Sequence, residues 1–303
     1  MSNILITGAT GFIGSHLVKF LSKNNYHIIA HGSSTESIRK LQENLKSNNI
    51  GLENIKFWQQ NFLDIEWDYP DFSDIKTIIH CAAITKVREG TIENYNKYFN
   101  INVLATKRLA QKALEEKINH FVYLSTGQIF GIPATFPITE ATPKNPINLY
   151  GMTKLMGEKV VVSLGYFGLN YTIIRPFSIY GKGHHNIISI IVDKLSNNET
   201  VTIFGDGTQT RAFLHISDFC RAITLTQNNR ECFNQEYNLS GLKEYSVIEL
   251  VNLISSKLNI SPEIEYHSSN VNELKRNLAD LSKIRRLGFI PKETLEDFIN
   301  QLK

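Results

Sequence analysis

Tyr150 and Lys154, four residues apart, are the pair in this chain best suited to acid–base chemistry. They begin a helix-like segment, and one helical turn places residues with this spacing on the same face. A cation near a phenol favours the phenolate and lowers the pKa of the phenol from about 10 toward the working pH. The pair therefore predicts a group that exchanges a proton with a hydroxyl or carbonyl oxygen. The competing interpretation is a solvated helix face.

Two hydroxyl residues, Ser125 and Thr126, end an expected strand ahead of this pair. Ligands of parallel α/β sheets bind at the carboxyl ends of strands. A hydroxyl there can hydrogen-bond the substrate oxygen that Tyr150 protonates. We assign this role to Thr126, with Ser125 supporting it or contacting a cofactor. The predicted catalytic residues are Thr126, Tyr150 and Lys154.

A glycine-rich segment near the N-terminus contains Gly8, Gly11 and Gly14, between the strand-like Asn3–Thr7 and a helix-like stretch. In this context the first glycine permits a tight turn, and the second lets the backbone approach a pyrophosphate. The third allows close helix packing, and the helix N-terminus directs N–H groups at the anion. The segment predicts dinucleotide binding but no particular reaction. An ordinary strand-to-helix turn is the alternative.

The end of the second expected strand distinguishes the two nicotinamide dinucleotides. An acidic residue there binds the ribose 2′-hydroxyl of NAD, whereas basic or small polar residues accept the phosphate of NADP. Here the strand ends in His31-Gly32-Ser33-Ser34, with no carboxylate before Glu36. Ser33, Ser34 and Arg39 are predicted to hold the phosphate. NADP(H) is therefore favoured, with NAD(H) as the alternative.

Short apolar runs that alternate with amphipathic segments must position these residues, and this alternation predicts a parallel sheet covered on both faces. The fold class is α/β: a Rossmann-type doubly wound parallel sheet at 1–175, to which later segments can return, and a smaller C-terminal α+β substrate lobe at 176–303. The expected strands are Asn3–Thr7, Tyr26–His31, Ile55–Trp58, Lys76–His80, His120–Ser125 and Asn170–Arg175. The expected helices are Phe12–Lys23, Ser37–Ser47, Glu93–Glu116 and Leu149–Tyr166.

The composition excludes several other classes of protein. The 303 residues carry a net charge of only +3, which does not argue for nucleic acid or a membrane surface as a partner. The three cysteines lack metal-ligand or paired spacing, so we expect no metal. No apolar stretch is long enough for a membrane span, and the chain begins with a strand rather than a signal peptide, so we expect a cytoplasmic protein.

Matches to one family extend over nearly the whole chain. The sequence resembles the extended short-chain dehydrogenase/reductase family, in its nucleotide-sugar epimerase/dehydratase/reductase branch. The matching segments are Thr7 to Gly14, His80-Cys81-Ala82-Ala83, Asn102-Val103, Ser125-Thr126, Tyr150 to Lys154, Arg175 to Gly181, Gly205 to Arg211 and Leu287 to Pro291.

This resemblance implies roles for individual residues. Thr126, Tyr150 and Lys154 would form the catalytic triad, with Lys154 also holding the nicotinamide ribose. Cofactor contacts would come from Gly8, Gly11, Phe12, Ile13, Gly14, Asn61, Phe62, Ala82, Ala83, Thr85, Asn102, Ser125, Pro176 and Phe177. Substrate contacts would come from Thr126 and Ser178, with Arg211 and, on weaker support, Arg276 on the diphosphate. For both arginines, an interdomain salt bridge is the alternative.

Two departures from the family pattern bear on function. Asn61 stands where an aspartate often contacts adenine, and its amide can still serve the adenine edge. Sugar 4,6-dehydratases of this family carry Asp-Glu after the catalytic threonine. This chain has Gly127-Gln128 there, which argues against dehydration.

The leading hypothesis is therefore NADPH-dependent reduction of a 4-keto nucleotide-sugar at C4, with Tyr150 as the proton donor. An NAD-dependent nucleotide-sugar 4-epimerase is the alternative. A reductase of a non-nucleotide ketone and a non-catalytic dinucleotide sensor are weaker alternatives. We also expect a homodimer, formed through the helices at Glu93–Glu116 and Leu149–Tyr166.

Overall fold

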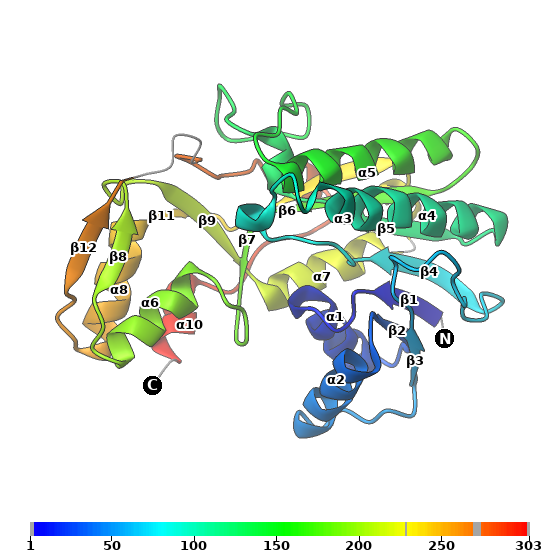
Figure 1. The fold of residues 1–303 in the computed structure, drawn as a ribbon, viewed down its shortest axis with the longest axis horizontal. Helices are drawn as coiled ribbons and strands as arrows, with labels where there is room; N and C mark the ends of the chain where they lie inside the picture. Colours follow the sequence, from blue (N-terminus) through cyan, green and yellow to red (C-terminus); the bar gives the residue numbers. More distant parts are fainter. Residues whose placement is uncertain (1–2, 228, 269–273, 302–303) are drawn as a thin grey trace. The chain divides into compact units, whose positions relative to one another are not determined.

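The computed structural model describes residues 3–227, 229–268 and 274–301, which form two compact units (Figure 1). Of these residues, unit 1 contains those in the ranges 3–131, 144–175 and 220–237, and unit 2 contains those in the ranges 132–143, 176–219 and 238–301. Residues 132–143, assigned above to the first domain, thus belong to unit 2, and 220–237 return to unit 1. None of the described helices combines the length and apolar character required to cross a bilayer.

A seven-stranded sheet with the order β10-β6-β5-β4-β1-β2-β3 organises unit 1. Its strands are β1 (Asn3–Thr7), β2 (His27–Gly32), β3 (Ile55–Gln59), β4 (Ile75–His80), β5 (His120–Leu124), β6 (Tyr171–Pro176) and β10 (Gln235–Leu239). Neighbouring strands from β3 to β6 pair in parallel. The strand order changes direction between β1 and β4, and this switch point is where ligands of open α/β sheets bind. The predicted Rossmann-type fold is confirmed.

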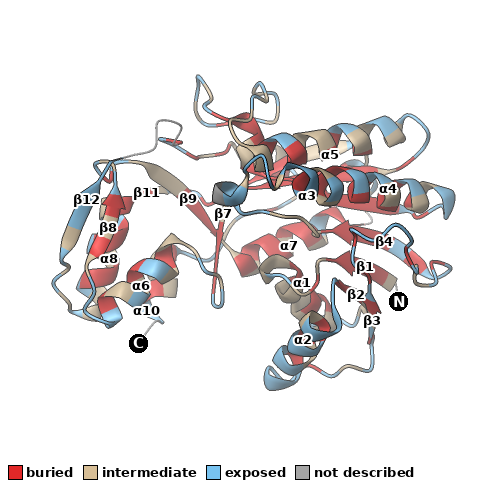
Figure 2. Cartoon of the chain, viewed as in Figure 1, coloured by how far each residue is buried: buried red, intermediate tan, exposed pale blue. Residues whose placement is uncertain are grey.

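Helices cover the strands on both sides. Figure 1 shows α4 (Ala105–Glu115) and α5 (Leu149–Gly165) on one side and α1 (Phe12–Lys23) and α2 (Thr35–Ser47) on the other. Apolar residues of the strands, such as Ile78 and Phe121, share a core with Leu109 of α4 and Val161 of α5. The strands are correspondingly the most buried part of the unit in Figure 2.

The helix expected at Glu93–Glu116 is divided into three segments. These are α3 (Tyr95–Phe99), a π-helical turn (Asn100–Leu104) and α4. Single π-turns within helices frequently mark functional sites. Short 3₁₀ turns lie at Val87–Glu89, Gly127–Phe130 and Arg230–Cys232.

Unit 2 contains two small sheets with the strand orders β11-β9-β7 and β12-β8. Its core joins residues of both sheets, such as Phe213 and Val201, to Ile191, Val251 and Leu295 from three helices. The elements are β7 (Ser178–Tyr180), α6 (Ile187–Ser196), β8 (Val201–Phe204), β9 (Thr210–His215), β11 (Glu244–Ser246), α8 (Val247–Leu258), β12 (Ile264–His267), α9 (Ser282–Arg285) and α10 (Leu295–Asn300). Helix α7 (Ile216–Thr226) runs from unit 2 into unit 1.

Candidate active site

The glycine loop after β1 is closed too tightly for side chains at two positions. Gly8 has φ +65°, and a Cβ there would lie 2.7 Å from the Cα of Ala82. At Gly14 a Cβ would lie 2.2 Å from the carbonyl oxygen of Gly8. Gly11 is exposed and begins α1 without a side-chain cap, so Phe12 and Ile13 follow at an uncapped helix start. Such a loop presents backbone N–H groups to an anion.

His31, the penultimate residue of β2, supports this loop. Its Nδ1 accepts a hydrogen bond from the backbone N–H of Gly8 at 3.1 Å, and its Nε2 lies 2.9 Å from the carbonyl oxygen of Gln60. Burial lowers the pKa of His31 to about 4, so the imidazole is neutral at physiological pH. The end of β2 is where a side chain usually selects between NAD and NADP. Here the His31 side chain at that position binds the glycine loop instead.

The three residues predicted to bind a 2′-phosphate are exposed and follow β2 in the sequence. The Ser34 hydroxyl caps α2 by accepting the N–H of Ser37. The Arg39 guanidinium pairs with Glu36 and Glu43 along the same helix. Both side chains thus interact within α2, whereas Ser33 lies in the turn that precedes it.

Asn61 and Phe62, predicted to contact the adenosine, occupy different environments. Phe62 is buried and stacks between the rings of His31 and Trp67, with centroid distances of 4.2 and 4.3 Å. Its ring therefore belongs to the core and supports His31. Asn61 is exposed, and its Oδ1 accepts the backbone N–H of Leu63 at 3.1 Å.

The loop after β4 lies against the glycine loop. The N–H of Ala82 donates to the Oγ1 of Thr7 at 3.3 Å. Further along this loop, Ala83 is partly buried and Thr85 is exposed. Asn102, in the π-helical turn, binds both the N–H and the carbonyl of Ile84 at 2.9 and 3.0 Å. Its Nδ2 also donates to Thr153 at 3.0 Å, so Asn102 connects this loop to α5.

The three predicted catalytic residues come together at the end of β5. Thr126 follows the strand and hydrogen-bonds Tyr150, which lies in the first turn of α5. Asn148 caps α5 through the N–H of Gly151 and donates to the Oε1 of Gln128, which fixes the helix start beside Thr126. The Oγ of Ser125 is buried with no hydrogen-bond partner among the described residues.

The electrostatics of the pair differ from the sequence prediction. Burial raises the pKa of Tyr150 to about 12, although the Thr126 hydrogen bond acts in the opposite direction. Burial also lowers the pKa of Lys154 to about 7, against the opposing charge of Glu158. The expected lowering of the Tyr150 pKa is therefore wrong for this structure. The reason is the burial of the phenol. The Lys154 Nζ lies over the Tyr123 ring, 4.1 Å from its centroid.

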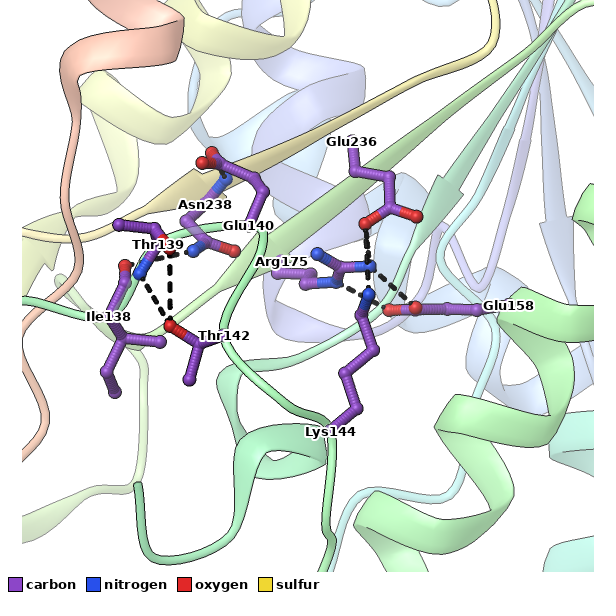
Figure 3. Close-up of polar contacts among 9 residues, drawn as sticks. All are labelled: Ile138, Thr139, Glu140, Thr142, Lys144, Glu158, Arg175, Glu236 and Asn238. Atoms are coloured by element: carbon purple, nitrogen blue, oxygen red, sulfur yellow. Dashed lines mark hydrogen bonds and ion pairs between the residues drawn. The ribbon is translucent and has the colours of Figure 1, made fainter. Parts of the chain in front are cut away.

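Sequence reasoning missed an ionic cluster formed by Lys144, Glu158, Arg175 and Glu236, of which Glu158 and Arg175 are buried (Figure 3). Glu158 lies four residues after Lys154, so the helical period could have placed both side chains on one face of α5. Its partner Arg175, on β6, could not be identified from spacing alone.

The residues predicted to reach the nicotinamide and the substrate lie at the start of unit 2. Pro176 and Phe177 are buried, and the Phe177 N–H donates to the carbonyl of Leu239 at 2.8 Å. Ser178 begins β7 and is partly buried.

Arg211 and Arg276 lie on neighbouring extended segments of unit 2. The N–H groups of Thr210 and Ala212, on either side of Arg211, bond the carbonyls of Lys275 and Asn277. Arg276 pairs with Glu244 at 2.5 Å and stacks over Phe136. The structure thus brings the two predicted diphosphate ligands to one small sheet, with Arg276 already in an ion pair inside the unit.

A family model for the NAD dependent epimerase/dehydratase family matches residues 4–240. The chain belongs to this family. The resemblance inferred from the sequence is confirmed, and this epimerase/dehydratase-family chain is an enzyme of the extended short-chain dehydrogenase type.

Three relatives illustrate the similarity of this family member to known proteins. A Methanocaldococcus jannaschii protein with the provisional name UDP-glucose 4-epimerase is 33% identical, over 99% of this chain and 96% of its own length. The UDP-glucose 4-epimerase of Halalkalibacterium halodurans is 31% identical, over 82% and 78%. The crystal structure of the Bacillus cereus UDP-glucuronic acid 4-epimerase with UDP-glucuronic acid and NAD is 28% identical. It superposes with a TM-score of 0.88, covering 98% of this chain and 96% of that one.

The residues of this enzyme fit a nicotinamide dinucleotide. The glycine loop leaves no room for side chains at Gly8 and Gly14, and the uncapped start of α1 directs N–H groups outward. The buried, unpartnered Oγ of Ser125 needs a hydrogen-bond partner, since such groups in proteins are almost always satisfied. These features are in the same unit as Thr126, Tyr150 and Lys154.

Proposed function

We propose that this enzyme is a 4-epimerase of UDP-linked hexoses or hexuronic acids that uses NAD. The observation that carries the proposal is the grouping of Thr126 with Tyr150 at the end of β5, with Lys154 buried against Tyr123 of the same strand. This is the arrangement that exchange of a hydroxyl proton requires. Relatives named UDP-glucose 4-epimerase, and solved epimerases that hold a UDP-sugar with NAD, support the substrate and cofactor class.

The dinucleotide, when bound, supplies a hydride acceptor and later returns the same hydride. The protein must then manage one proton at the sugar C4 oxygen. In the oxidative half, Tyr150 must first be ionised; its phenolate oxygen then takes this proton as the C4–H bond breaks and the carbonyl forms. In the reductive half, the 4-keto sugar has rotated so that the opposite face of C4 receives the hydride, and Tyr150 returns the proton to the C4 oxygen. Atoms and electrons therefore balance without an external reductant.

The surrounding residues adapt Tyr150 to both directions of proton transfer, donation and uptake. A raised pKa keeps Tyr150 a neutral phenol, which suits proton donation. Proton uptake needs a nearby positive charge, which Lys154 carries in its protonated form. Thr126 orients the phenol by its hydrogen bond and gives the sugar oxygen a second polar neighbour. Ser125 and the glycine loop would hold the dinucleotide.

NAD is preferred here over the NADP(H) predicted from the sequence. The related crystal structures contain NAD, and an epimerase returns the hydride to its substrate, so it consumes no reductant. Ser34 and Arg39 also have partners within α2.

The test has two readouts. Nucleotide released from the purified protein by denaturation is identified by mass, and we expect NAD. The protein is then incubated with UDP-glucose, UDP-glucuronic acid and UDP-N-acetylglucosamine, and the C4 epimers are resolved by chromatography and proton NMR. We expect one of these to reach an equilibrium mixture without net formation of NADH. A protein that binds NAD but converts none of the three would contradict the proposal.

The 4-keto nucleotide-sugar reductase remains the second candidate. The observation in its favour is the absence of a carboxylate at the end of β2, where His31 stands. Consumption of NADPH with a 4-keto-6-deoxy nucleotide-sugar, without epimerisation of UDP-sugars, would favour this function.

A further inference from the structure

Glu158, one helical turn after the proposed catalytic lysine on α5, forms a buried ion pair with Arg175. The side chains are 2% and 0% exposed. The Nε and Nη2 of Arg175 donate to the two carboxylate oxygens of Glu158, each at 2.8 Å. This two-pronged geometry is the strongest form of an arginine–carboxylate contact. Glu158 therefore has a fixed position one helical turn beyond Lys154 and two turns beyond Tyr150.

Two more exposed residues, Glu236 and Lys144, complete the cluster. Glu236, on β10, binds the Nη2 of Arg175 from another direction, and Lys144 lies 3.3 Å from Glu236 (Figure 3). Burial alone would lower the pKa of Arg175, but both carboxylates outweigh burial and raise it. Arg175 is thus a permanent cation between an inner carboxylate, Glu158, and an outer one, Glu236, which is 30% exposed.

Stability alone gives little reason to keep this cluster. Taking two charges out of water costs several kcal/mol per ion, and apolar residues of similar volume are often as stabilising as a buried ion pair. A buried carboxylate beside a proposed catalytic lysine therefore points to an electrostatic role.

The other titratable groups packed around Lys154 are uncharged. They are Tyr150 on α5, His80 and Cys81 at the end of β4, and Tyr123 on β5. Burial raises the pKa of both tyrosines and of the Cys81 thiol, and it lowers the pKa of His80, so each is neutral at physiological pH. Among these described neighbours, Glu158 is the one anion.

We propose that Glu158 is a positioning residue that acts through Lys154: held by Arg175, its carboxylate keeps the ammonium charged in a site that would otherwise favour the neutral amine. The inference rests on the proposed function, since it concerns the lysine of the same reaction. Glu158 neither contacts substrate nor exchanges a proton. It sets the pH range in which Lys154 can assist Tyr150.

Two glutamine variants separate this role from a structural one. Glu158→Gln removes the charge next to Lys154, and Glu236→Gln removes the other carboxylate of the same arginine. Both loosen the Arg175 cluster, but only the first changes the charge beside Lys154. Epimerase kcat is measured from pH 5.5 to 9.5. In parallel, the Lys154 titration is followed by NMR of protein labelled with ¹³C at lysine Cε, with Lys154→Met identifying the signal.

For Glu158→Gln we expect the alkaline loss of kcat and the Lys154 titration to move to lower pH together, by about one unit. At pH 8 the rate would fall about tenfold, because one unit is a tenfold change in the charged fraction. Glu236→Gln should keep the wild-type midpoints. Glu158→Asp retains the negative charge, so its pH dependence of kcat and its Lys154 titration should lie close to those of the wild type. Unchanged midpoints in Glu158→Gln, or equal shifts in both glutamine variants, would overturn the proposal.

The NMR titration needs no substrate, which separates this inference from the proposed function. A wild type that epimerises no UDP-sugar, but whose Lys154 titration responds only to Glu158→Gln, would refute the function and retain the inference. If Glu158→Gln does not fold because Arg175 loses its partner, the double variant Glu158→Gln/Arg175→Lys replaces it, because the lysine keeps a cation that can pair with Glu236. The Lys154 titration should again move to lower pH; an unmoved titration would count against the proposal.

Discussion

The Lys154 ammonium lies over the face of Tyr123, 4.1 Å from the ring centroid. Tyr123 approaches α5 closely because position 157 is glycine, where a Cβ would lie 2.1 Å from the Tyr123 hydroxyl. An aromatic face attracts a cation but provides less stabilisation than water. The lysine that the proposed reaction requires is therefore costly for the folded protein, with its pKa lowered by burial to about 7.

Replacement of Lys154 by methionine should stabilise the protein while abolishing activity. Between the folded-state pKa of about 7 and the unfolded value of 10.5, the unfolded chain binds more protons, so wild-type stability rises with pH in this window. Below pH 7 the full penalty applies, with an upper bound of roughly 5 kcal/mol. Urea unfolding of nucleotide-free protein should show a more stable Lys154→Met variant at pH 7. The advantage should shrink toward pH 10, and a variant less stable at pH 7 would contradict this.

Tyr150→Phe should reduce the epimerase rate by a factor of about 10² to 10⁴, since phenylalanine cannot exchange a proton. Its fold and retained dinucleotide should be unchanged, as checked by circular dichroism and by the mass of released nucleotide. Tyr171→Phe on β6 is the control, because Tyr171 lies in the core of the sheet and should leave the rate unaltered. Comparable rates in Tyr150→Phe and wild type would remove Tyr150 from the reaction.

Two glycines of the same loop should respond differently to alanine. In Gly14→Ala the new methyl meets the backbone of Gly8 and Ala9, at 2.2 and 2.7 Å, so the loop and α1 must separate and the fold is lost or severely weakened. In Gly11→Ala the nearest atom is 3.3 Å away and the backbone is unstrained, so the fold should survive. The new methyl group would still hinder the approach of a dinucleotide pyrophosphate to the loop backbone, so NAD binding should weaken. Thermal unfolding and NAD titration calorimetry measure the two effects, and equal stability losses would refute the distinction.

His31→Leu should weaken NAD binding about tenfold, because the Gly8 N–H loses its acceptor and a buried unsatisfied donor costs about 1–3 kcal/mol. Ser34→Ala provides a matched control at the same turn. It removes the α2 cap, worth about 1 kcal/mol of stability, without touching the glycine loop. Calorimetry with NAD and NADP on both variants tests this. A loss of NADP affinity in Ser34→Ala would instead support the phosphate role predicted from the sequence.

Local patterns predicted much of unit 1. The strand Asn3–Thr7 and the helix Phe12–Lys23 have the expected bounds, because short apolar runs and the glycine loop are readable within a few residues. The grouping of Thr126 with Tyr150 was also anticipated, since sheet topology brings strand ends together.

Contacts between distant residues could not be predicted in this way. The ring of His31 is oriented by residues 23 and 29 positions away, and Arg175 by carboxylates 17 and 61 positions away. The raised pKa of Tyr150 depends on the depth of its burial, which no spacing encodes. The π-helical turn could not be predicted for the same reason, because its residue Asn102 hydrogen-bonds residues 18 and 51 positions away.

The place of β10 beside β6 has a consequence for how the chain is made. A nascent chain that has emerged as far as residue 176 contains six of the seven strands, but β6 is still an open edge. Its Arg175 also still lacks one of its two carboxylates, which arrives 61 residues later. Open edges recruit strands from other chains. Residues 176–219 of unit 2 must therefore be synthesised before β10 can pair with β6 and cover this open edge.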